Sequence, residues 1–180
     1  MKNKTIWSNR FKNKTSQSFQ KIGSSIHIDK RLYEQDIAAS IVHTKMLMKQ
    51  KIIKSENGNK IINGLKKIKA QIDKGNFEFK EKFEDIHLNI EKALFEIIGP
   101  SAGFLHTARS RNDQVVTDFK LWVKEASNEI IKNISFVMKN LIKKAEKNTD
   151  TVMPGLTHLK NAQPISFAHY LLSYYEMLKR

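Results

Sequence analysis

The feature that most constrains the fold is a continuous stretch, residues 104–153, that contains neither glycine nor proline. Apolar residues recur there every three or four positions, as on one face of a helix: Val115, Phe119, Trp122, Ala126, Ile130, Ile134, Val137, Leu141 and Ala145. A second row widens the apolar stripe: Val116, Val123, Ile131, Met138 and Ile142. The pattern predicts one helix over about 111–148, roughly 55 Å long at 1.5 Å per residue. Because a compact chain of this size does not need so long a helix, we expect a helical bundle and an oligomer.

The segments before this stretch also have the periodicity of helices. Residues 1–30 are polar and basic and have no sustained period, so we expect an extended arm. Three helices are then predicted: from Arg31 to about Gln50, from an N-cap at Ser55 to just before Gly75, and over 82–98, ended by Gly99 and Pro100.

The segment after the long helix predicts a loop followed by one more helix. Residues 149–163 are polar and indicate a long connection, and Pro164 favours the start of a helix that is still running at Arg180. We therefore predict an all-α protein with two domains. Residues 1–105 form an N-terminal arm and a small helical domain, and residues 106–180 form the first part of a long-helix bundle.

Composition excludes several classes of protein. The chain has 180 residues and no cysteine, which excludes a disulfide framework and a thiolate metal site. The N-terminus lacks the apolar core of a secretory signal, and no apolar run approaches the length of a membrane span. We therefore expect a cytoplasmic protein without a membrane partner.

The formal net charge of +14 has two interpretations. A basic surface can bind nucleic acid or another acidic partner. The alternative is compositional drift, because lysine, isoleucine and asparagine are raised together. The lysines are spread over every amphipathic segment instead of being clustered, which favours drift and argues against a nucleic-acid partner.

Residues 106–114 gather directional polar groups in an otherwise lysine-dominated chain. Two of the five arginines, Arg109 and Arg111, lie there. Ser110 and Asp113 fit a capping box at the start of the long helix, but capping does not explain positive charge at a helix N-terminus. Arginine pairs with carboxylates through two parallel hydrogen bonds, and free N–H groups at a helix N-terminus attract anions. The stretch therefore favours a binding site for a multiply charged acid.

Two further polar segments are candidate sites. Thr157 and His158 lie in the predicted loop, where a histidine can act as a general acid or base or can be an unimportant surface residue. In "FEDIHLNIE", Asp85 and His87 point about 200° apart on a helix, so surface pairing of His87 with Glu84 or Glu91 is the simpler interpretation. Nucleotide-binding and zinc motifs are absent, so we expect no metal and no nucleotide cofactor.

Several motifs together resemble a known family. "LHTARSRNDQVVTD", "MPGLTHLKNAQP" and "EDIHLNIE" are similar to motifs of the argininosuccinate lyases, of the aspartase/fumarase superfamily. "IWSNRF", "SSIHIDKRLYEQDIAAS" and "GPSAGFLH" occur in the same order as in that family. The likeness extends from about Ile6 to Arg180 and implies the N-terminal portion of such an enzyme.

The resemblance implies an activity and an assembly. The reaction is the reversible elimination of argininosuccinate to L-arginine and fumarate, in arginine biosynthesis, without a cofactor. The family forms homotetramers around a central bundle of long helices, and each active site is shared between subunits. A mobile serine loop of the G-S-S-x-M-P-x-K-x-N type lies well downstream in the family, so we expect these 180 residues to be inactive alone.

Motif matching assigns roles residue by residue. His158 corresponds to the catalytic histidine, and whether it or the loop serine is the base stays open. The implied substrate contacts are Ser25, Arg111, Asn112 and Thr157. The implied supporting residues are Asp85, His87 and Arg109. Two alternatives remain: a non-catalytic truncated lyase-derived protein, or another lyase of the superfamily, such as adenylosuccinate lyase.

Overall fold

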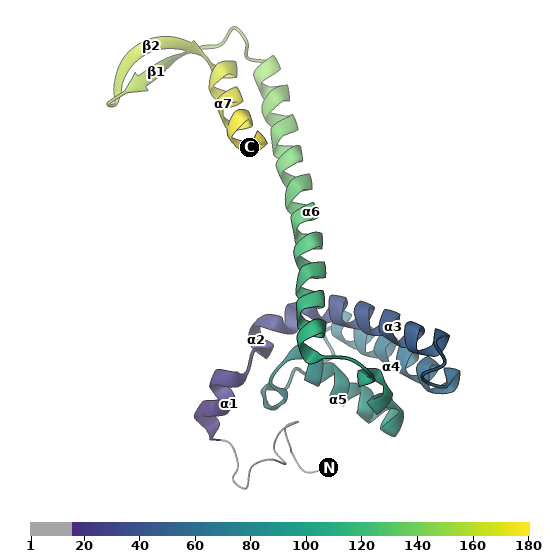
Figure 1. The fold of residues 1–180 in the computed structure, drawn as a ribbon. Helices are drawn as coiled ribbons and strands as arrows, with labels where there is room; N and C mark the ends of the chain where they lie inside the picture. The colour runs from purple at the N-terminus through teal and green to yellow at the C-terminus, as the bar shows by residue number, and fades with distance from the viewer. Residues whose placement is uncertain (1–15) are drawn as a thin grey trace. The chain divides into compact units, whose positions relative to one another are not determined.

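A computed structural model describes residues 16–180 of the chain (Figure 1). The described residues are mostly helical, which confirms the predicted all-α class, with one two-stranded hairpin as the only sheet among them. The chain divides between Trp122 and Val123 into two units. No helix between residues 16 and 180 combines the length and the apolar character of a membrane span.

The first unit is a small helical domain. Its elements are α1 (Gln17–Gly23), α2 (Ile26–Asp29), the 3-10 turn η2 (Lys30–Leu32), α3 (Tyr33–Lys49), α4 (Ser55–Asp73), η3 (Glu81–Phe83), α5 (Ile86–Ile98), η4 (Gly99–His106) and the first turns of α6 (Arg111–Glu146). The helices α3, α4 and α5 pack on one another around a fully buried core (Figure 1). Its members are aliphatic residues spaced at helical intervals: Ile37, Leu47, Ile61, Leu65, Ile68, Ile86, Ile90 and Leu94.

One glycine sets how closely two of these helices approach. A Cβ atom at Gly64 of α4 would lie 2.5 Å from Cδ1 of Leu94 on α5. Because real Cβ atoms do not tolerate such a distance, any other residue at position 64 would force the end of the Leu94 side chain to move. The packing of Leu94 therefore depends on a missing side chain at position 64.

Three predictions for this unit need correction, while the predicted end of the third helix before Gly99 is confirmed. Residues 17–29 form α1 and α2 instead of an extended arm, while the rest of the predicted arm, residues 1–15, lies outside the described residues. Ser55 is the first residue of α4, and the N-cap is Lys54. The third helix begins at Ile86 because the Asp85 carboxylate accepts a hydrogen bond from the Leu88 amide and caps it there. After Gly99 the chain continues as the 3-10 turn η4.

The long helix is close to its predicted length. The helix α6 runs from Arg111 to Glu146, against the predicted 111–148. Its first turns belong to the first unit because Gln114 and Asp118 are buried there. The predicted domain boundary between residues 105 and 106 stays a prediction.

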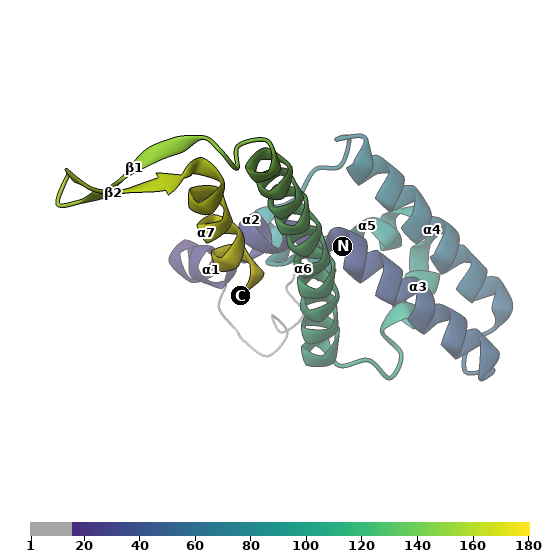
Figure 2. The ribbon, with the colours of Figure 1, turned by 90° about the horizontal axis from the view of Figure 1, so that it is seen from above.

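The second unit consists of the rest of α6, a hairpin and a last helix (Figure 2). The hairpin strands are β1 (Val152–Thr157) and β2 (Lys160–Ser166), and the helix is α7 (Phe167–Lys179). A small apolar cluster joins α6 to α7: Leu141, Ala145, Phe167, Ala168 and Leu171.

The predicted loop and the predicted start of the last helix are wrong. Residues 152–166 pair as antiparallel strands, with Pro154 opposite Pro164, and α7 begins at Phe167. Ser166 caps α7 by accepting a hydrogen bond from the His169 amide, at 3.1 Å. The two prolines and the scarcity of alternating apolar residues hid the strands, because proline is depleted in sheets and strands are usually recognised by alternation.

Candidate functional site

Four buried polar side chains from three helices form a group, which we call the Asp36 cluster. Its members are Asp36 of α3, His87 of α5, and Gln114 and Asp118 of α6, with exposed fractions of 1%, 3%, 6% and 0%. Hydrogen bonds join three of them, and neither carboxylate oxygen of Asp118 has a hydrogen-bond partner among the described residues. Asp36 is its centre, since its Oδ1 accepts hydrogen bonds from His87 Nδ1, at 3.0 Å, and from Gln114 Nε2. His87 Nδ1 also lies 3.5 Å from Oδ2 of Asp118.

The environment of the Asp36 cluster shifts the pKa values of its members in different directions. Burial favours a neutral Asp36, but the hydrogen bonds and charge of its neighbours outweigh burial and lower its pKa. Burial and the adjacent Asp36 carboxylate raise the pKa of Asp118 to about 7. For His87, burial lowers the pKa, yet the bond to Asp36 and its charge are stronger and raise it. The Asp36 carboxylate is therefore kept ionised, whereas Asp118 keeps its proton until the pH approaches about 7.

Three members of this cluster could in principle ligate a metal ion. The ligand atoms of Asp36, His87 and Asp118 lie within 4.8 Å of one another. However, His87 directs its Nδ1–H at Asp36, and Nη2 of Arg109 lies 3.8 Å from the same oxygen. A positive neighbour and a competing donor make this oxygen a hydrogen-bond acceptor for protein groups. The geometry therefore favours a proton network over a cation site.

The surface role considered for His87 is wrong. Its side chain is buried and pairs with Asp36 and Asp118, and neither Glu84 nor Glu91 pairs with it. Asp85 and His87 have different partners, because Asp85 is the N-cap that precedes α5 while His87 points into the Asp36 cluster.

The two arginines before and at the start of α6 lie in different surroundings. Arg109 is almost buried, and its Nη1 donates to Oγ of Ser40 at 2.9 Å. Arg111 is 25% exposed, and its Nη1 donates to Oε1 of Gln114 at 3.1 Å. Arg109 thus binds a side chain in the interior, whereas Arg111 is partly exposed at the surface.

Two carboxylates lie near Arg111 without forming hydrogen bonds to it. Arg111 Nε is 4.0 Å from Oδ2 of Asp85, and Nη2 is 3.6 Å from Oε2 of Glu91. Nη2 is buried and has no hydrogen-bond partner among the described residues. Asn112, the next residue, is exposed. The start of α6 therefore offers a guanidinium with unused donor capacity and an exposed amide.

A strained turn brings Ser25 close to the start of α5. Glu84 has φ 64° and ψ −63°, and the Asp85 amide donates to the Phe83 carbonyl at 2.7 Å. This is the rarer, strained form of the γ-turn. It directs the Glu84 carbonyl at α2, where that oxygen accepts from the amides of Ser25, at 2.8 Å, and Ile26, at 3.0 Å.

The side chain of Ser25 is fixed by a carboxylate that bridges α2 and α5. Ser25 Oγ donates to Oδ2 of Asp29 at 2.6 Å, and the Ile86 amide donates to Oδ1 of Asp29 at 3.1 Å. Burial raises the pKa of Asp29, against these hydrogen bonds. Ser25 and Asp85, far apart in sequence, are thus both anchored at the N-terminus of α5.

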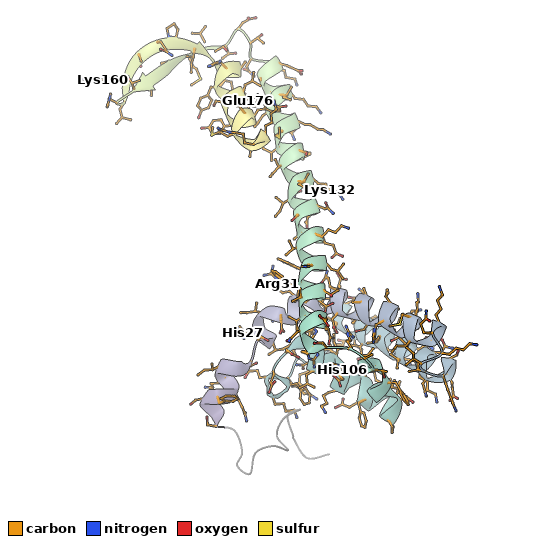
Figure 3. The ribbon with its side chains drawn as sticks, in the orientation of Figure 1. His27, Arg31, His106, Lys132, Lys160 and Glu176 are labelled. Atoms are coloured by element: carbon orange, nitrogen blue, oxygen red, sulfur yellow. The ribbon has the colours of Figure 1, made fainter. Side chains whose placement is uncertain are left out.

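Thr157 and His158 lie in the second unit, at the tip of the hairpin. Thr157 pairs with Lys160, which Figure 3 labels at the far end of the hairpin, so His158 and Leu159 form the two-residue turn. Both turn residues have left-handed backbones, with φ values of 53° and 61°. Thr157 and His158 are exposed, and Leu159 is 95% exposed. This turn type is normally formed by Asn-Gly, so a His-Leu pair is strained there.

Comparison with known proteins identifies the family. A family model described as Lyase matches residues 9–180. The chain belongs to this lyase family. An argininosuccinate lyase of Pelagibacter ubique is 57% identical over 178 residues, covering 99% of this chain and 38% of that protein. An argininosuccinate lyase of Bartonella bacilliformis is 48% identical over 97% of this chain and 38% of its own length. These relatives confirm the resemblance to argininosuccinate lyases.

The chain spans 38% of the length of these curated relatives. Among solved lyase structures, an EDDS lyase variant with bound fumarate has a TM-score of 0.70 and 26% identity, over 93% of this chain and 33% of that one. A fumarate lyase from Mesorhizobium sp. BNC1, at 17% identity and a TM-score of 0.66 over 94% of this chain and 39% of that one, shares the fold.

The residues at the centre of the buried site lie within the quoted motifs, but motif matching assigns no role to Asp36, Gln114 or Asp118. Nothing in the local pattern marks Asp36, Asp118 or the bridging Asp29, and Gln114 stands out only as part of a polar run. The sequence does contain one indication of the buried site. Gln114 and Asp118 are one turn apart on the long helix and therefore lie on the same face of it. Asp36, Ser40 and Thr44 are buried at intervals of four residues on α3, so that helix also carries a buried polar row. The catalytic, binding and supporting roles of the eight residues named from the motifs stay predictions.

Proposed function

We propose that the chain is part of an argininosuccinate lyase, which catalyses the reversible elimination of argininosuccinate to L-arginine and fumarate. The observation that carries this proposal is the 57% identity to an argininosuccinate lyase across nearly the whole chain. The similarity to an EDDS lyase with bound fumarate supports a four-carbon dicarboxylate as one reaction partner.

Arg111 and Asn112 bind and polarise a carboxylate of the substrate in this proposal. The Arg111 side chain is 25% exposed and makes only one hydrogen bond among the described residues, and α6 is a long helix whose first N–H groups favour an anion. Stabilising negative charge as it develops is the main task in proton abstraction next to a carboxylate. Ser25 is a further contact, with Asp85, His87 and Arg109 in support.

His158 and Thr157 supply the proton chemistry and an adjacent contact. A base removes the proton from the succinyl carbon, the carbanion is held as its aci-carboxylate, and the guanidinium nitrogen leaves after it is protonated. The exposed turn leaves the imidazole of His158 accessible to a substrate. Which group takes the proton, His158 or a serine outside these residues, stays open.

The proposal includes a cytoplasmic homotetramer that works in arginine biosynthesis and has active sites shared between subunits. Exposed apolar side chains on α6 and α7 support burial against further helices, because such surfaces are rarely left in water: Val123, Ile130, Ile131, Phe136, Val137, Leu172 and Met177. Size-exclusion chromatography with light scattering on the completed chain described next would test the tetramer.

The activity is tested on a completed chain, in which the remainder of the Pelagibacter relative follows Arg180. We expect fumarate to form from argininosuccinate, and neither adenylosuccinate nor aspartate to react. Formation of fumarate from adenylosuccinate alone would favour the other superfamily lyase, and inactivity toward all three substrates would favour a non-catalytic protein.

His158→Asn tests the mechanism in the same completed chain. Loss of the acid–base group is expected to lower kcat at least about 100-fold. His169→Asn is the matched control, because His169 is also an exposed histidine of the second unit. The 180-residue chain alone is expected to form no fumarate, and turnover by it would contradict the proposed division of the active site.

A further inference from the structure

Gln114 lies between the candidate substrate arginine and the buried Asp36. Its Oε1 accepts from Nη1 of Arg111 at 3.1 Å, and its Nε2 donates to Oδ1 of Asp36. Each end of the amide therefore has a partner, one at the surface and one in the interior. The side chain is 6% exposed, so it does not itself face solvent or a ligand.

The bond from Arg111 to Gln114 is the only hydrogen bond of the Arg111 side chain among residues 16–180. The nearby carboxylates of Asp85 and Glu91 attract the guanidinium at 4.0 and 3.6 Å, which is beyond hydrogen-bond range. Coulomb attraction to a partly exposed carboxylate draws the charge near but does not fix the guanidinium plane. Gln114 therefore provides the directional contact for Arg111.

Only an amide satisfies both neighbours of Gln114. Arg111 requires an acceptor, and the ionised Asp36 requires a donor. Glutamate at position 114 would place a second negative charge against Asp36, and methionine would give neither bond. Asp36 is in turn held by His87 of α5, at 3.0 Å, so the amide is anchored to two other helices.

We propose that Gln114 is a positioning residue, whose amide holds the partly exposed Arg111 guanidinium in register with the buried Asp36 so that the guanidinium can meet a substrate carboxylate. The part that concerns the substrate rests on the proposed function. The part that concerns Arg111 is a property of the 180-residue chain. A two-pronged pairing with a carboxylate requires a fixed guanidinium plane, which is what the amide supplies.

The first test measures solvent exchange of the Arg111 side-chain N–H protons by NMR on the 180-residue chain. Gln114→Met keeps the length of the side chain and removes both hydrogen bonds, so exchange should become roughly tenfold faster. Gln71→Met is the control, because Gln71 is an exposed glutamine on α4. Unchanged exchange in Gln114→Met would overturn the proposal.

A double variant that swaps the donor and the acceptor between positions 36 and 114 separates the positioning of Arg111 from general packing. Gln114→Glu alone places a second negative charge against Asp36, so it should also speed solvent exchange of the Arg111 N–H protons. Asp36→Asn combined with Gln114→Glu restores a donor opposite an acceptor, and the second oxygen of the introduced carboxylate still accepts from Arg111. Exchange in the double variant should return to within about threefold of the native rate. A double variant no slower than Gln114→Glu would contradict the amide bridge.

The kinetic test uses the completed chain. Gln114→Met should raise the KM for argininosuccinate by roughly tenfold and also lower kcat, because a loosened Arg111 binds the substrate carboxylate less well and stabilises its developing charge less well. A loss confined to kcat would overturn the proposal. Inactivity of the native completed chain would contradict the proposed function and not the positioning of Arg111, which the exchange rates decide.

Discussion

The Asp36 cluster and the tip of the hairpin hold their functional candidates by opposite means. In the cluster, side chains from three helices fix one another through buried hydrogen bonds. At the tip, backbone pairing of β1 with β2 sets the conformation, and His158 occupies a left-handed position that glycine or asparagine adopts more easily. Folding therefore explains the residue types of the cluster but not the histidine. A strained histidine that the turn does not require is consistent with the proposed role of His158 in proton transfer.

Asp36→Ala has the largest expected effect and tests whether the hydrogen bonds of the Asp36 cluster stabilise the first unit. Removing the shared acceptor leaves His87 and Gln114 without their buried partner, so we expect unfolding free energy to fall by about 3–5 kcal/mol. Urea unfolding of the 180-residue chain measures it. Lys120→Ala, at an exposed position of α6, is the control and should change stability by less than about 0.5 kcal/mol. A cost for Asp36→Ala below about 1 kcal/mol would show that the cluster does not hold the first unit together.

Asp118→Asn probes the proton in the cluster. The folded pKa of Asp118, about 7, lies above its ordinary value of 3.8, so the folded chain binds the proton more tightly. Stability from this group is full at low pH and is lost as pH rises from about 4 to 7. The raised pKa of His87 acts in the same direction above its ordinary 6.5. At about pH 8 the asparagine variant should therefore be more stable than the native chain by roughly 2 kcal/mol.

The same variant should be nearly neutral at about pH 5, where Asp118 already keeps its proton. Thermal unfolding at both pH values provides the measurement. Equal effects of Asp118→Asn at the two pH values would rule out titration of Asp118 as the cause.

Leu159→Gly tests the backbone strain at the tip of the hairpin. Glycine relieves the left-handed strain at the hairpin tip, which we expect to stabilise the hairpin by about 1 kcal/mol. Slower amide hydrogen exchange in residues 152–166 would report it, with exchange in α3 and α5 unchanged. Faster exchange in the hairpin would mean that Leu159 makes a stabilising contact there.

Helices and core could be predicted because their signal is local and repeats over many residues. Ile61, Leu65 and Ile68 fall at helical spacing and are buried as expected. The hairpin could not be predicted, since Pro154 and Pro164 face each other across it and few residues alternate in polarity. Local sequence patterns also cannot reveal a pair such as Asp36 and Gln114, whose positions differ by 78 residues.

The candidate site was predicted unevenly for the same reason. Arg109, Arg111 and His158 belong to short motifs with unusual composition, so the sequence alone is enough to find them. Their surroundings depend on which helices meet, and local spacing offers His87 no partner other than residues of its own helix. The buried acceptor Asp36 becomes evident only when α3, α5 and α6 are placed together.

The γ-turn at Glu84 has an evolutionary consequence. The group that holds Ser25 and Ile26 is the carbonyl of residue 84, an atom that every amino acid carries. Substitution at position 84 can change the cost of the turn, which glycine would lower, but it cannot delete the acceptor. The side chain at position 84 therefore decides how readily the turn forms, while the atom that places Ser25 is supplied by the backbone.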